Sequence, residues 1–238
     1  MGQLIVIRHA QASLMKEDYD QISDLGAIQS AALGHFLAEY HPEIDQVFRG
    51  NLKRHHQTTS IIRETLKSEG IETPEPTVLP EWNEHEGQKM GKYFIPKLIG
   101  VDPVMKEHAK SLGPDESANK RVFLRIFHRL TELWSEGKID TEEAGAESWA
   151  SFQERIQQGM QAIQESIQPN TKNLLITSGG SISVLMGEVL GLDVKKVLEL
   201  SWIVKNTSIS EFRVEPDGLK MRSFNEVGHL EPKLITYV

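Results

Sequence analysis

An arginine and a histidine stand together where a short apolar run ends near the start of the chain. Leu4-Ile5-Val6-Ile7 leads directly into Arg8, His9, Ala10 and Gln11. An imidazole can attack phosphorus as a nucleophile, and a guanidinium can bind phosphoryl oxygens through two parallel hydrogen bonds. A single histidine is more often structural than catalytic, so this pair indicates phosphoryl chemistry only together with other residues.

Two further arginines follow the next predicted strand. Arg49 comes directly after Val47-Phe48, and Arg54 lies about one helical turn beyond it. Three arginines gathered at the ends of parallel strands would clamp an oxyanion, and their charge would keep a neighbouring imidazole neutral and nucleophilic. The alternative is that each arginine lies on the surface and pairs with an acid.

A second apolar run, Leu174-Leu175-Ile176-Thr177, stops at Ser178-Gly179-Gly180. It resembles the first run in length and in its abrupt polar end, but it carries a hydroxyl where a second imidazole would suit the same chemistry. The glycines form a turn that leads into a helix, and this turn could present backbone amides to phosphate. We therefore expect Ser178 and Gly179 at the same anion site as the first turn.

Strand and helix signals alternate along the chain, which predicts an α/β fold with three layers (α/β/α) and a mostly parallel central sheet. Ligands in such folds bind at the carboxyl ends of the strands. The predicted strands are 4–7, 47–48, 78–79 and 174–177, with a hairpin over 208–214 and 219–224; the helices fall within 23–40, 52–70, 122–134, 149–167 and 182–190. We expect 1–238 to form a single domain, with 88–146 as a helical, cap-like insertion over the strand ends.

The composition excludes several classes of partner and of site. The 238 residues can bury one substantial core, and a formal charge of −8 argues against nucleic-acid or anionic-membrane partners. The chain has no cysteine, which excludes disulfides, thiol nucleophiles and thiolate metal sites. The first apolar run is too short for a signal peptide, and no segment has the length to cross a membrane. We expect a cytoplasmic protein; the sequence carries no signal for an oligomeric state.

Six segments in order resemble the histidine phosphatase superfamily, which includes the cofactor-dependent phosphoglycerate mutases. The run ending in Arg8-His9-Ala10-Gln11 is similar to its Arg-His-Gly signature, and Asn51-Leu52-Lys53-Arg54-His55-His56-Gln57-Thr58 is similar to its Pro-Leu-x-Arg-Ala-x-Gln-Thr block. The other resembling segments are 24–31, 147–148, 206–209 and 225–230. Single motifs of this length are weak evidence, but six in the correct order are strong.

The resemblance implies a phosphohistidine mechanism on a phosphomonoester or a phosphorylated partner. His9 would attack phosphorus, while Arg8 and Arg54 would bind the phosphoryl oxygens and Gln11 would contribute to the phosphate site. No metal or other cofactor is implied. Adjacent helical positions also prevent His55 and His56 from facing one ion, so we expect this pair to be exposed to solvent or to lie behind the substrate-binding side chains.

The resemblance implies that a carboxylic acid protonates the leaving alcohol. Glu84 occupies the position that resembles the family's Leu-x-Glu segment, and nearby carboxylates would raise its pKa. Glu81 and Glu86 are the rival candidates, because the spacing to Gly87 differs from the usual one. A solvated acidic loop is the alternative for all three glutamates.

Ser178 replaces the second catalytic histidine of the resembling family. Losing one preorganised donor costs about 3 kcal/mol of transition-state stabilisation, or roughly a hundredfold in rate. His85 and His229 are the candidates for filling this gap. A second departure, Ala10 for the usual glycine, is small if the backbone there has negative φ.

Three functions remain open: a phosphatase with a modified pocket, a weak or inactive member that binds phosphorylated ligands or protein partners, and a mutase. The retained nucleophile, arginines and acid favour the phosphatase. The residues after Gln11 do not resemble the substrate loop of the phosphoglycerate mutases. Lys92, Arg121 and Arg125 in the insertion are either contacts to an anionic substrate or solvated surface charges.

Overall fold

The computed structural model describes residues 1–13 and 20–237. The chain divides into two compact units, Met1–Glu84 with Arg155–Val238, and His85–Glu154. None of the helices in the described residues is long and apolar enough to cross a membrane.

The strands are β1 (Gly2–Arg8), β2 (Gln46–Arg49), β3 (Thr77–Val78), β4 (Lys172–Thr177), β5 (Ile209–Glu215) and β6 (Gly218–Glu226). The α-helices are α1 (Asp24–Tyr40), α2 (Lys53–Ser68), α3 (Gly87–Leu98), α4 (Pro103–Ala109), α5 (Glu116–Ser135), α6 (Trp149–Ser166), α7 (Gly179–Leu190) and α8 (Val194–Ser201).

The first unit is built on a six-stranded sheet with the order β3-β2-β4-β1-β5-β6. The first four strands of this order run parallel, and β5 and β6 are antiparallel, so the predicted mostly parallel sheet is confirmed. β1 and β4 are neighbours, and Arg8 is in register with Thr177. The backbone N–H of His9 donates to the carbonyl of Thr177 at 2.8 Å. The two polar turns therefore leave the sheet side by side.

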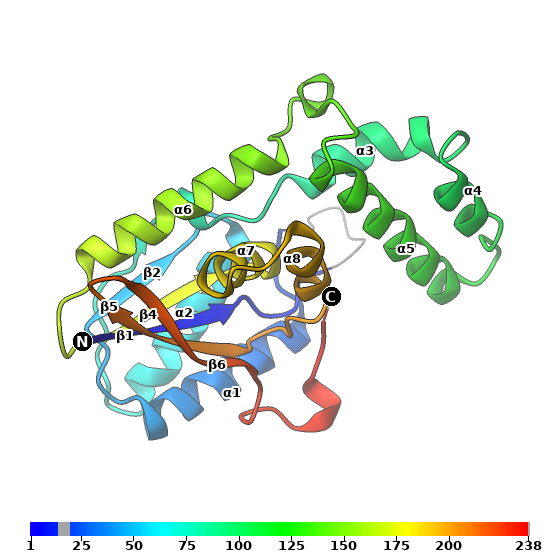
Figure 1. Cartoon of the computed structure of the whole chain (residues 1–238). Helices are drawn as coiled ribbons and strands as arrows, with labels where there is room; N and C mark the ends of the chain where they lie inside the picture. The colour runs from blue at the N-terminus through cyan, green and yellow to red at the C-terminus, as the bar shows by residue number, and fades with distance from the viewer. Residues whose placement is uncertain (14–19, 238) are drawn as a thin grey trace. The chain divides into compact units, whose positions relative to one another are not determined.

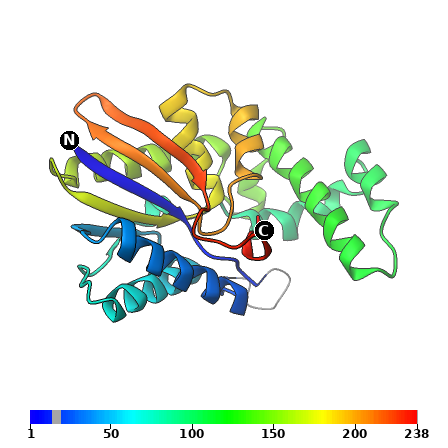
Figure 2. The ribbon, with the colours of Figure 1, turned by 90° about the horizontal axis from the view of Figure 1, so that it is seen from below.

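Helices cover both faces of this sheet (Figure 1). α1 and α2 lie together on one face, as the view from below also shows (Figure 2), while α7 and the part of α6 within this unit lie on the other. Alternation along β1 sends Ile5 and Ile7 toward α1 and α2, where they join a buried cluster with Leu33, Leu37 and Ile62. This burial packs the later turns of α2 against the sheet.

Local sequence explains where α1 begins and how it meets α2. The hydroxyl of Ser23 accepts a hydrogen bond from the backbone N–H of Gly26, which satisfies one amide of the first turn. Gly34 then allows the two helices to approach closely, because a Cβ added there would lie 2.6 Å from the Cβ of Thr65. A side chain at this position would push α2 away from α1.

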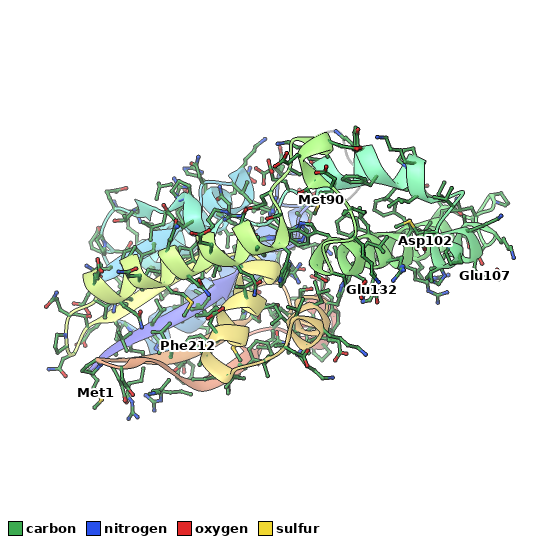
Figure 3. The ribbon with its side chains drawn as sticks, turned by 45° about the horizontal axis from the view of Figure 1, so that its top comes forward. Met1, Met90, Asp102, Glu107, Glu132 and Phe212 are labelled. Carbon is green, nitrogen blue, oxygen red and sulfur yellow. The ribbon has the colours of Figure 1, made fainter. Side chains whose placement is uncertain are left out.

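The second unit is helical and has its own buried side chains. Asp102 caps α4 by accepting from the backbone N–H groups of Val104 and Met105, and it also binds the guanidinium of Arg129 on α5. Figure 3 labels Asp102 together with Glu132, which accepts a second hydrogen bond from Arg129. The cationic side chains that were candidates for substrate contacts, Lys92, Arg121 and Arg125, are exposed.

Candidate functional site

His9 follows β1 and is only 5% exposed. Its Nδ1–H donates to the carbonyl of Ala10 at 2.7 Å, which leaves the lone pair on Nε2. Burial, together with the charges of Arg54 and Arg8, holds the pKa of His9 well below its ordinary value of 6.5. The ring is therefore neutral at physiological pH, with Nε2 available as a nucleophile.

The backbone around His9 is fixed from two directions. Thr58 of α2 accepts from the amide of Ala10 at 3.1 Å, and Asn206 donates its side-chain N–H to the carbonyl of His9 at 3.1 Å. The amide of Thr207 donates to the carbonyl of Arg8 at 3.0 Å. These contacts fix the orientation of the imidazole.

Arg54 lies in the first turn of α2 and is 6% exposed. Its Nε–H donates to Nε2 of His9 at 3.1 Å, and its Nη1 pairs with Asp20 at 2.8 Å. Asp20 also accepts from the amide of Lys53 at 2.8 Å, at a helix start where Leu52 offers no side-chain cap. Asp20 therefore caps α2 and orients the arginine. The sequence analysis missed this residue, although a helix start lacking its own cap is a signal for a distant acid.

Arg8 lies beside the start of α7. A Cβ added at Gly179 would lie 3.4 Å from Nε of Arg8, so the glycine keeps the guanidinium close to the helix N-terminus. Nη1 donates to the backbone carbonyls of Val204 and Tyr237 in the C-terminal part of the chain. The structure thus brings Arg8 and Gly179 together, as the sequence analysis expects.

Ser178 and His55 form a buried pair. The Oγ of Ser178 lies 2.7 Å from Nε2 of His55, and neither residue is exposed. The His55 ring centroid lies 5.6 Å from that of His9. His56 is exposed and His55 is buried against Ser178, so each of the two alternatives expected for the pair describes one of its members. Burial, followed by the charges of Arg54 and Arg49, holds the pKa of His55 well below its ordinary value.

Among the three candidate acids, Glu84 lies next to the turn at Ser178. Its Oε2 accepts from the backbone N–H of Gly180 at 3.0 Å, and a Cβ added at Gly180 would lie 2.2 Å from Oε1. The carboxylate thus fills the space that a side chain at Gly180 would take. Glu86 belongs to the second unit, where it binds Lys89 and the amide of Glu147.

Glu81 lies in the first unit, on the short helix Pro80–Trp82, and its Oε2 is buried without a hydrogen-bond partner among the described residues. Glu84 is the carboxylate that the fold brings to the start of α7.

The remaining candidates have partners of their own. Gln11 accepts from the hydroxyl of Ser23 at 2.9 Å and so supports the cap of α1. His229 lies 3.2 Å from the hydroxyl of Thr207, and burial lowers its pKa to about 4. His85 packs in the second unit, with its ring centroid 4.8 Å from that of Trp134. The imidazole that contacts Ser178 is neither His85 nor His229.

The site combines a neutral imidazole, two guanidiniums, a hydroxyl and a carboxylate around the carboxyl ends of β1 and β4. Guanidiniums and helix-terminal amides bind phosphoryl oxygens, and the imidazole and the carboxylate suit nucleophilic attack and proton transfer. Within the described residues, no group of three histidine, aspartate or glutamate side chains is placed to hold a metal ion.

Comparison with solved structures supports the same fold. YhfR from Bacillus stearothermophilus superimposes with a TM-score of 0.67 at 16% identity, covering 97% of this chain and 100% of that one. The alpha-ribazole phosphatase from Shigella flexneri gives 0.62 at 16% identity, covering 94% and 96%. A phosphoglycerate mutase from Bacillus anthracis str. Sterne gives 0.60 at 16% identity, covering 95% and 94%. At such identities the likeness concerns the fold alone.

Sequence comparison identifies the family. No curated protein matches the chain. A model of the histidine phosphatase superfamily (branch 1) matches residues 109–227, which is half of the 238 residues and includes Ser178 and the α7 turn. The chain belongs to the histidine phosphatase superfamily, branch 1.

Proposed function

We propose that this protein hydrolyses phosphomonoesters through a phosphohistidine intermediate on His9. The observation that carries the proposal is the state of His9: its Nδ1–H is bound to a backbone carbonyl, and its Nε2 faces the guanidinium of Arg54 at 3.1 Å. A nucleophilic nitrogen beside a fixed cation suits attack on an anionic phosphoryl group. Both phosphatases and a mutase occur among the structural neighbours.

The reaction proceeds in two displacements. Nε2 of His9 attacks phosphorus, the bond from phosphorus to the ester oxygen breaks, and the leaving alcohol takes a proton from Glu84. Glu84, now a carboxylate, removes a proton from water, which attacks phosphorus and breaks the N–P bond. Phosphate leaves, the electron pair returns to Nε2, and Glu84 regains its proton. Arg8 and Arg54 bind the equatorial oxygens throughout.

Hydrolysis is favoured over a mutase reaction. A mutase must hold its substrate and return the phosphoryl group to another position, for which the family's mutases carry a longer substrate loop after the first signature. The sequence after Gln11 does not resemble that loop; residues 14–19 of this segment lie outside the described residues. We propose a small phosphomonoester, or a phosphorylated partner, as the substrate.

The proposal predicts measurable turnover of p-nitrophenyl phosphate. The purified chain should release nitrophenol and phosphate in equal amounts, and orthovanadate should inhibit competitively. Because the pKa of His9 is held well below 6.5, the neutral imidazole persists as pH falls, so activity should remain at pH 5.5. A rate no higher than that of a His9→Ala variant at every pH from 5 to 8 would refute hydrolysis.

A further inference from the structure

Two substitutions in this chain compensate for one another in space. In the pattern that the chain resembles, an alanine follows the arginine of α2 and a histidine stands at the end of β4. Here His55 stands in the first position and Ser178 in the second. These residues are 123 positions apart in sequence, yet their side chains meet at 2.7 Å. In this chain the imidazole of the pair therefore comes from α2 and the hydroxyl from the end of β4.

The surroundings are built to receive the imidazole of His55. A Cβ added at Gly50 would lie 2.3 Å from Nδ1 of His55, so any other residue at that position would displace the ring. Ser178 is the N-cap residue of α7, a position where a serine side chain ordinarily binds the helix backbone. Its hydroxyl makes no such cap and contacts His55 instead.

Hydrogen bonding indicates which nitrogen carries the proton. Nδ1 of His55 is buried and has no hydrogen-bond partner among the described residues. An unpaired buried N–H is less tolerable than an unpaired acceptor, so the proton belongs on Nε2. Nε2–H then donates to Oγ of Ser178, and the hydroxyl proton of Ser178 remains available for another acceptor. The nearby acceptor formed in the proposed reaction is a phosphoryl oxygen on His9.

We propose that His55 and Ser178 act together in place of the second histidine of the site. Ser178 donates its hydroxyl proton to the phosphoryl group during transfer, and His55 is the positioning residue that holds and polarises this hydroxyl. The inference rests on the proposed phosphatase activity. A serine alone is shorter than histidine and free to rotate, whereas a serine held by a buried imidazole is a preorganised donor.

A mutational cycle tests the pair. His55→Ala and Ser178→Ala should each lower kcat about a hundredfold with little change in KM, since one transition-state donor is lost. The double alanine variant should lose no more than either single variant, because the two residues act as a unit. The double variant His55→Ala/Ser178→His, which restores the resembling pattern, should recover kcat to within about tenfold of wild type.

Two further variants separate positioning from packing. His55→Gln keeps a donor near the place of Nε2 and should retain more activity than His55→Leu, which only fills space. His56→Ala is the matched control, because this exposed neighbour makes no contact with Ser178, and it should leave kcat unchanged. Equal activity of the glutamine and leucine variants, multiplicative losses in the double alanine variant, or wild-type kcat in His55→Ala would each overturn the proposal.

Failure of the pair is distinguishable from failure of the proposed function. If wild type is active and His55→Ala is equally active, only the pair is rejected. If wild type is no faster than His9→Ala, hydrolysis is rejected, and calorimetric binding of orthovanadate, an analogue of the transition state, decides about the pair. His55→Ala should then weaken orthovanadate binding about tenfold or more, because the hydroxyl of Ser178 is no longer held in place, and unchanged affinity would reject the pair as well.

Discussion

His9→Ala is expected to lower kcat for aryl phosphate hydrolysis on the order of 10⁴-fold or more. The remaining rate is the one that the site supports without its nucleophile. The variant removes the atom that forms the covalent intermediate, so no second displacement can follow. Arg8, Arg54 and the start of α7 would remain, and they would still bind inorganic phosphate. The expected signature is therefore a collapse of kcat with retained phosphate affinity, measured by stopped assays and calorimetry.

A matched control exists in the same part of the molecule. His35 lies on α1, exposed and paired with Glu69, and His35→Ala should keep wild-type kcat. Retention of activity within tenfold of wild type in His9→Ala would contradict the assignment of the nucleophile, provided that the variant unfolds in urea at a midpoint close to that of wild type.

Arg54→Ala is expected to lower kcat/KM about a thousandfold. The guanidinium contacts the nucleophile and is buried, so its charge acts on the transferring phosphoryl group with little screening. Arg54→Lys should recover only a small part of the loss, because an ammonium lacks the planar fork that reaches His9 and Asp20 at once.

Asp20→Asn separates the roles of charge and orientation. The asparagine keeps one acceptor oxygen, which can serve either Arg54 or the amide of Lys53, and it removes the charge. Because the guanidinium itself remains, the loss should be smaller than that of Arg54→Ala, at roughly tenfold in kcat/KM. Steady-state kinetics of Arg54→Ala, Arg54→Lys and Asp20→Asn on one aryl phosphate measures the order of these losses in kcat/KM. Wild-type kcat/KM in Arg54→Ala would show that this arginine does not bind the transferring group.

The fold was predictable where local signals and burial agree. Ser23 caps α1, and the apolar runs of β1 and β4 become neighbouring parallel strands. The start of α7 was predicted three residues late, because Gly179 and Gly180 disfavour helix. The amide of Gly180 is held by a tertiary contact instead, because it donates to Glu84, whose carboxylate occupies the space above this glycine. Similarly, α3 was missed because Pro96 lies inside it, while Met90 and Phe94 bury one of its faces.

The site was predictable where a residue acts from its own strand end or helix start. His9 follows a strand, and Arg54 lies in the first turn of a helix. Glu84 was chosen by the resemblance instead, with Glu81 and Glu86 as rivals. For His55 the sequence left exposure and burial behind the site both open, because the residues that make its burial favourable, Gly50 and Ser178, come from other elements. Asp20 was missed for a related reason, since its partner lies 34 positions away in sequence.

The stereochemical course at phosphorus tests the central claim most directly. A phosphomonoester made chiral with oxygen isotopes and sulfur would be hydrolysed in labelled water, and the configuration of the released thiophosphate would be determined by NMR. Each in-line displacement inverts phosphorus, so a phosphohistidine on His9 followed by attack of water predicts overall retention. Inversion would show that water attacks the ester directly, and would contradict the phosphohistidine mechanism.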